Sequence, residues 1–302
     1  MTKRIRLAGA GVLVCALLTQ ARAGETVVCA GTFAGADRLS RPAAVATDAR
    51  GKAYVLDRKD HAVKVFNSAG ALLSDLRLGK EIIPAPWRIG VSRDGARIYL
   101  TDWHSHVVVG VDASGTLRHR WGGRGHIDGR FMFPGTLVVD ADGNVFVADR
   151  GRKRVQKFTS EGKRLKTFLI RDPSKNRLDS KHLGVVGLGV WRDGSVSSLL
   201  RHDELGLGMI YTLDATGVQQ SRTSHWHIPE PTCMVALGRD RMLAGAANGD
   251  VMLINDRTKY GRTWHLRKDV GTIFDMALLG TGTLLTVDER GRRVMRCRIT
   301  VE

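Results

Sequence analysis

The residues best suited to bind a ligand in this 302-residue chain are arginines and lysines, and they gather in one stretch. Between Arg150 and Lys181 there are 12 basic residues against 3 carboxylates, which leaves a local net charge of +9. A guanidinium offers two parallel N–H donors to a carboxylate, phosphate or sulfate, so this stretch predicts a site for an anionic group. The alternative is a solvated basic rim with no specific partner. The residues that we expect to bind the anion are Arg150, Arg152, Lys153, Arg171, Lys175, Arg177 and Lys181, together with Arg58 and Arg290.

Histidines form a second group with chemical potential. His225 and His227 lie two residues apart, and His182 precedes an earlier apolar run in the same way. Imidazoles can act as zinc ligands, so these three are candidates for a metal site. Calcium needs several oxygen ligands, and the apolar runs nearby contain a single carboxylate, Asp275. We expect no cofactor, with zinc or calcium as the open alternative.

The elements that must position these side chains come from an internal repeat. Residues Pro42–Asp57, Pro86–Asp102 and Pro134–Asp149 share one pattern: an apolar run, a turn containing glycine, and an alternating strand that ends in Asp. The period is 44 residues from the first proline to the second and 48 from the second to the third. Repeats of this length, each made of four short strands, are typical of β-propeller blades.

The pattern continues more weakly to the end of the chain. Further units begin near His182, Pro231 and Ile273, and the sixth ends one strand short. Residues 25–33 can supply the missing strand, because residues 30–42 resemble the segment that precedes the third unit. We therefore predict an all-β fold, a six-bladed β-propeller closed by pairing of the N-terminal strand into the last blade, which removes exposed sheet edges.

This closure brings two cysteines onto neighbouring strands. Cys29 lies in the N-terminal strand and Cys297 in the last strand of the chain, so we predict a disulfide between them. Two buried thiols are the alternative. Cys233 falls in an apolar run and is expected to be a small core residue.

The first 23 residues look like an export signal. Lys3, Arg4 and Arg6 precede an apolar run of about a dozen residues, and Ala21-Arg22-Ala23 is a small-x-small cleavage pattern. We expect residues 1–23 to be a signal peptide, residues 24–302 to be one propeller domain, and the mature protein to be periplasmic or secreted. Its net charge falls from +17 to +13, because the leader contains four basic residues and no acidic one. No later stretch is long enough to cross a membrane, and a monomer is expected.

The three strongest repeats resemble NHL repeats. The residues that carry the resemblance are Gly125–Pro134, Asp142–Asp149 and Arg154–Phe158, and the likeness weakens after residue 180. The resemblance implies a six-bladed ring with a binding surface around a central funnel. It does not imply one activity, because the family includes nucleic-acid binders, protein-interaction modules and a lyase.

The function that we expect is binding without catalysis. The predicted channel contains no evident general acid–base pair, which disfavours an enzyme. The basic loops favour an anionic polymer or an acidic protein segment as ligand, and export disfavours nucleic acid. The alternative is a metal-dependent lyase or hydrolase that resembles the peptide-amidating lyase propellers.

Overall fold

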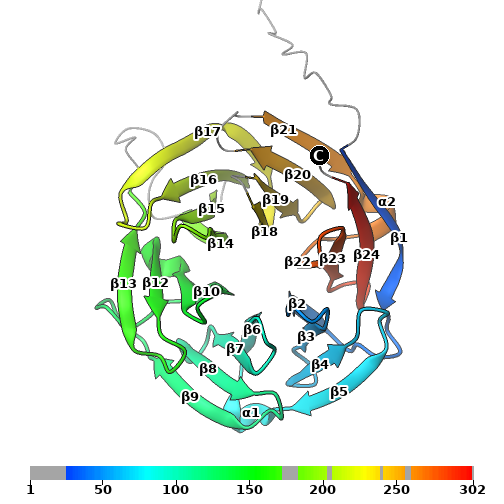
Figure 1. Ribbon diagram of the computed structural model, residues 1–302, viewed down its shortest axis with the longest axis horizontal. Coiled ribbons are helices and arrows are strands. Elements are labelled where there is room, and N and C mark those ends of the chain that lie inside the picture. The colour runs from blue at the N-terminus through cyan, green and yellow to red at the C-terminus, as the bar shows by residue number, and fades with distance from the viewer. Residues whose placement is uncertain (1–24, 172–182, 203–205, 239–240, 256–259, 301–302) are drawn as a thin grey trace, which may run out of the picture.

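The protein is a ring of six four-stranded antiparallel sheets, the blades, around a central channel (Figure 1). The computed structural model describes residues 25–171, 183–202, 206–238, 241–255 and 260–300. Within each blade the first strand lies nearest the channel and the fourth on the outside. Blade 1 contains β2 (Pro42–Thr47), β3 (Ala53–Asp57), β4 (Ala62–Phe66) and β5 (Leu72–Arg77). Blade 2 contains β6 (Pro86–Val91), β7 (Arg97–Asp102), β8 (Val107–Asp112) and β9 (Leu117–Gly122). Blade 3 contains β10 (Pro134–Val139), β11 (Val145–Asp149), β12 (Arg154–Phe158) and β13 (Arg164–Leu169).

The second half of the ring repeats this arrangement, and short helices lie in the connections. Blade 4 contains β14 (Leu183–Val190), β15 (Val196–His202), β16 (Leu207–Leu213) and β17 (Gln219–Pro229). Blade 5 contains β18 (Pro231–Gly238), β19 (Arg241–Ala246), β20 (Asp250–Asn255) and β21 (Tyr260–His265). Blade 6 contains β22 (Asp275–Leu279), β23 (Thr283–Asp288), β24 (Arg293–Thr300) and β1 (Thr26–Ala34). The helical turns are α1 (Gly79–Ile82), η1 (Arg150–Arg152) and α2 (Arg267–Val270).

The core lies between neighbouring blades, because both faces of a middle strand are covered. All five residues of β3 and of β11 are buried. Between blades 2 and 3, the indole ring of Trp121 packs edge-on against Tyr99 at 6.0 Å and lies 5.8 Å from Phe158. Aromatic pairs at this separation add to the stabilisation from buried apolar area, so each blade needs its neighbours to bury its faces.

The aspartate that ends the second strand holds two loops together. In blade 2 the buried Asp102 carboxylate accepts the backbone N–H groups of Ala85, His104 and Ser105 at 2.8–3.0 Å. In blade 3 the Asp149 carboxylate accepts those of Met132 and Phe133 at 3.0 and 3.2 Å. These bonds tie the loop between second and third strands to the connection that enters the same blade, and hydrogen bonds to a charged acceptor are the stronger kind.

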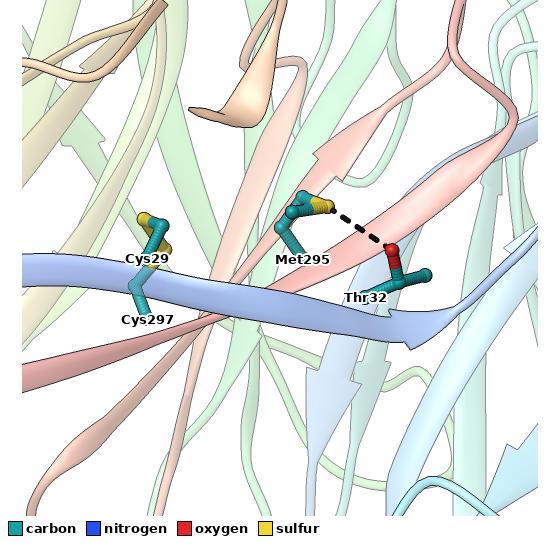
Figure 2. Close-up of a disulfide and its surroundings, with 4 residues drawn as sticks. All are labelled: Cys29, Thr32, Met295 and Cys297. Carbon is teal, nitrogen blue, oxygen red and sulfur yellow. Dashed lines mark hydrogen bonds between the residues drawn. A yellow bond between two sulfur atoms is a disulfide. The ribbon is translucent and has the colours of Figure 1, made fainter. Parts of the chain in front are cut away.

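The ring closes where the two ends of the chain pair, as predicted. β1 runs antiparallel beside β24, and Cys29 is the direct register partner of Cys297 (Figure 1). The two sulfurs form a disulfide that joins residues 268 positions apart (Figure 2). The Thr32 hydroxyl contacts the Met295 sulfur at 3.8 Å further along the same strand pair. The predicted fold, closure and disulfide are confirmed.

Residues 1–23, where the signal peptide is predicted, lie outside the described residues. Among the helices that are described, none is long and apolar enough to cross a membrane.

Candidate functional site

Two sets of loops share one face of the ring, which we call the upper face. The strands of each blade alternate in direction, so the loops between second and third strands lie on the same side as the connections between blades. The predicted basic residues Arg58, Arg150, Arg152 and Lys153 are in the first set of loops, which brings them to the upper face.

At the centre of the upper face a small cavity opens into the channel. Its volume is about 140 Å³. Three guanidinium groups line it, and each comes from a different blade: Arg88 from blade 2, Arg150 from blade 3 and Arg201 from blade 4. We call these three arginines, with the rings of Trp87 and Phe274, the arginine mouth. The remaining lining residues are Gly135, Thr136, Val185, Val186 and Thr232.

Arg88 extends across the channel. Its Nη2 lies 3.3 Å from the Phe274 carbonyl oxygen of blade 6 and 3.5 Å from the Thr232 carbonyl oxygen of blade 5, on the far side of the ring from blade 2. The residue is 6% exposed and lines both the mouth and the cavity below it. Within the described part of the chain, no carboxylate forms an ion pair with this buried guanidinium. Its hydrogen-bond acceptors there are the neutral carbonyl groups of Phe274, Thr232 and Trp87.

Two aromatic rings hold the cations at the mouth. The Arg58 guanidinium lies over the Trp87 ring at 4.1 Å, and that of Arg88 lies 4.7 Å from the Phe274 ring. Burial lowers the pKa of Arg58 to about 10, although the Glu289 carboxylate, 3.3 Å away, opposes this shift. Two nitrogens of Arg58, Nε and Nη2, are buried and have no acceptor among the described residues. The cation–π contact with Trp87 therefore holds the Arg58 guanidinium while two of its nitrogens remain without an acceptor among the described residues.

A glycine makes room for the arginine of blade 3. Arg150 begins the helical turn η1, and its backbone N–H donates to the Phe133 carbonyl at 3.0 Å. A Cβ at Gly184 in β14 would lie 2.5 Å from Arg150 Nε, inside the contact limit. The missing side chain of Gly184 therefore lets Arg150 reach the mouth along β14.

Below the mouth most of the lining residues of the channel are apolar, and Asp275 is the one carboxylate among them. The cavity there has a volume of about 310 Å³, and its walls are mainly Val, Ile, Leu, Ala and Met side chains of the six inner strands. The buried Asp275 accepts the Val45 backbone N–H at 3.0 Å. Burial raises the pKa of Asp275, and the nearby Arg88 charge opposes the shift. The channel therefore contains a carboxyl group whose burial favours its neutral form.

The predicted basic residues divide into three sets. Arg150 lines the mouth and Arg58 lies beside it. Arg152, Arg171 and Arg290 are exposed outside the mouth, and Lys153 closes its loop in a left-handed conformation with φ at 48°. The segment with Lys175, Arg177 and Lys181 lies outside the described residues, as does His182.

The remaining histidine candidates belong to an outer strand. His225 and His227 lie in β17 of blade 4, where only the backbone is described. Among the described residues, no three His, Cys, Asp or Glu side chains come close enough to hold a metal ion.

Two arginines of the mouth, Arg88 and Arg201, are not among the basic residues predicted to bind the anion. A signal for Arg88 was present, because it occupies the position of Ala44, Thr136 and Cys233 in other blades. A charge at an otherwise apolar or neutral channel position indicates a functional group.

Comparisons with known proteins agree with this architecture. The NHL repeat family matches residues 131–158. Virginiamycin B lyase from Staphylococcus aureus is 12% identical, with a TM-score of 0.62 over 91% of this chain and 99% of that chain. A gluconolactonase from Xanthomonas campestris is 15% identical, with a TM-score of 0.63 over 91% and 90%. A chain of the nidogen/laminin complex is 14% identical, with a TM-score of 0.61 over 80% and 85%. Sequence identities this low show that the proteins share a fold, and they do not show a shared function. The protein is thus a six-bladed β-propeller with an NHL repeat in blade 3.

Proposed function

We propose that the protein is an exported binding propeller that captures an anionic ligand in the arginine mouth. The observation that carries the proposal is the Arg88 guanidinium, which is buried without a carboxylate ion pair among the described residues. A buried charge is costly unless an opposite charge compensates it. A carboxylate, phosphate or sulfate of a ligand would supply that charge.

The surroundings support binding. Arg150 and Arg201 face the same cavity, so an anion there meets three guanidinium groups in a partly desolvated site. The net charge of +13 that remains after removal of residues 1–23 would attract an anionic ligand over a long range, and the clustered loops would guide it to the upper face. The Cys29–Cys297 disulfide is compatible with the oxidising compartment that export implies.

An acidic protein segment fits this proposal better than a bulky polymer. The mouth, at about 140 Å³, is smaller than the cavities of 300 Å³ or more that hold drug-sized molecules. It suits one projecting carboxylate. The structural relative in the nidogen/laminin complex is a propeller fold found in a protein assembly, which is consistent with such a partner.

Calorimetric titration with a pentaglutamate peptide tests the proposal. We expect binding at about 20 mM NaCl that weakens by about tenfold or more at about 200 mM, because salt screens charge–charge attraction. Substituting Arg201→Gln should weaken binding by about tenfold or more through loss of a charge-assisted contact.

The matched control is Arg93→Gln, which removes the same charge from an exposed position on the opposite face. Equal weakening in both variants would mean that the peptide responds to net charge alone. Absence of binding at low salt would contradict the proposal outright.

A further inference from the structure

Building on the proposed anion site, we infer that the upper face over blades 2 and 3 is a docking surface for an acidic protein segment with apolar side chains beside its acid. The acid would enter the arginine mouth, and the apolar side chains would lie on exposed residues outside it. Three such residues, Trp103, Ile127 and Phe133, define the docking surface.

An aromatic row leads from the mouth to Trp103. The Phe274 and Trp87 rings are 5.7 Å apart in the mouth, and the Trp87 and Trp103 rings are 6.2 Å apart. The His104 ring follows at 6.3 Å. Trp103 is 46% exposed although it is one of the largest apolar side chains. The row gives a continuous surface from the buried anion site to the solvent.

Phe133 extends the surface toward blade 3. Its ring is 42% exposed and rests on the His106 ring at a centroid distance of 5.1 Å. Phe133 precedes β10, whose Gly135 and Thr136 line the mouth. Phe133 is therefore two and three positions along the chain from these two residues of the mouth.

Ile127 is exposed on a loop that is firmly held. It is 72% exposed in the connection between β9 and β10. The buried Arg154 side chain donates to the Ile127 carbonyl at 3.0 Å and to the Arg130 carbonyl at 2.7 Å. An apolar side chain on a preorganised loop loses little conformational entropy on binding, which favours a contact role.

These three residues lie on one face of the ring, unlike the other exposed apolar residues. Among the described residues, nine large apolar side chains are exposed, and only Trp103, Ile127 and Phe133 lie on the upper face. The others lie on outer strands or on a turn at the opposite face: Val28, Leu73, Leu117, Leu165, Leu169 and Val218.

The chemistry of the surface favours protein over glycan or nucleic acid. Trp and Arg are the residue types that dominate binding energy at protein interfaces, and Phe is enriched there. Ile127 presents methyl and methylene groups without a flat ring face, which suits aliphatic side chains rather than stacked bases. The neighbouring positive charges select acidic segments by complementarity.

Selection from a phage-displayed library of random dodecapeptides on the intact protein tests the inference. We expect enriched peptides to combine Asp or Glu with aromatic or aliphatic residues. One enriched peptide, made synthetically, should bind the Trp103→Ser/Phe133→Ser variant at least about tenfold more weakly than the wild type, as for interface hot spots.

The control variant is Leu73→Ser/Leu165→Ser, which removes two apolar side chains of similar exposure, 50% and 47%, from outer strands. Its affinity for the peptide should equal that of the wild type. Equal peptide affinity in both double variants, or enrichment of peptides without acids, would overturn the docking surface.

The two proposals fail in different ways. If pentaglutamate binds and Arg201→Gln weakens it, but no acidic peptide is enriched, the anion site stands and the docking surface falls. An oligogalacturonate that binds more tightly than every enriched peptide, and depends on Trp103, would replace the protein partner with an acidic glycan. Failure of pentaglutamate to bind would remove both proposals.

Discussion

The chemistry of the channel depends on two residues of opposite charge type. Arg88 and Asp275 are both buried in the channel, and neither forms an ion pair among the described residues. Burial raises the pKa of Asp275, so the folded protein favours the neutral carboxyl group. An ionised Asp275 would compete with a ligand anion for the field of Arg88.

Replacing Asp275 with asparagine should therefore strengthen anion binding. The Asp275→Asn variant keeps an oxygen that can accept the Val45 N–H and removes the competing negative charge. We expect pentaglutamate affinity to rise by roughly threefold to tenfold near pH 8, as for one charge interaction at a partly buried site. Titration calorimetry on both proteins measures this difference.

The same substitution has a defined effect on stability. Because the folded-state pKa lies above the unfolded value of about 3.9, the wild type loses stability as the pH rises from about 4 through the folded pKa. The variant does not titrate there, so its free energy of unfolding relative to the wild type should increase between pH 4 and 8 in urea titrations. If the wild type instead became more stable relative to the variant as the pH rises, the raised pKa of Asp275 would be contradicted.

The residues of the site were only partly predictable from the sequence. Arg150 and Arg58 were found because they follow the aspartate that ends a strand, which places them in loops of known direction. Arg88 was missed because an inner strand reads as structural. Charge counting also included Arg154, whose guanidinium is buried and donates to three carbonyl groups of the loop before β10.

At the scale of elements, the site depends on how the ends of the strands position the loops of the upper face. The aspartates of β3, β7, β11 and β23 are buried at the upper end of their strands and hold neighbouring loops. The strands and loops of blades 1 to 3 could therefore be predicted in detail from the sequence. β15 ends instead in His202 and β19 in Ala246, so the sequence defined the loops of blades 4 and 5 poorly.

The contact between Arg150 of η1 and Gly184 of β14 can be tested by substitution. Gly184→Ala should leave the fold intact, because the new Cβ meets the flexible Arg150 side chain rather than backbone. The arginine must move from the mouth, and pentaglutamate affinity should fall by about threefold to thirtyfold. Arg150→Gln alone should cause a similar loss.

A double-mutant cycle makes this prediction specific. If Gly184→Ala acts through Arg150, combining it with Arg150→Gln should add little further loss, since residues in contact are not additive. Independent, additive losses would show that Gly184 affects the mouth in another way. Circular dichroism of each variant checks that the fold is retained.

At the scale of the whole molecule, the repeat period made the architecture predictable. The six units, the missing strand and the place of the first strand all followed from spacing. The convergence of Arg88, Arg150 and Arg201 did not, because it depends on side chains from three different blades, of which Arg88 extends across the channel.

The disulfide should contribute substantially to global stability. Replacing both Cys29 and Cys297 with alanine should lower the free energy of unfolding by about 3–5 kcal/mol, because a bond across 268 residues restricts the unfolded chain strongly. Urea unfolding measures the change. Cys233→Ala is the control: this buried thiol, whose pKa burial raises to about 12, forms no disulfide, and its loss should cost only about 1 kcal/mol. Equal effects of the two changes would contradict the role of the closure.

The pairing of β1 with β24 also sets an order of events during synthesis. A growing chain can assemble blades 1 to 5 from neighbouring segments, but β1 has no partner until the last strand has emerged. Formation of the Cys29–Cys297 disulfide, in which an external oxidant takes two electrons from the two thiols, therefore requires a closed ring, and a chain that lacks β24 cannot form it. The bond is therefore a chemical record that the chain has been synthesised through its last strand and that the ring has been assembled.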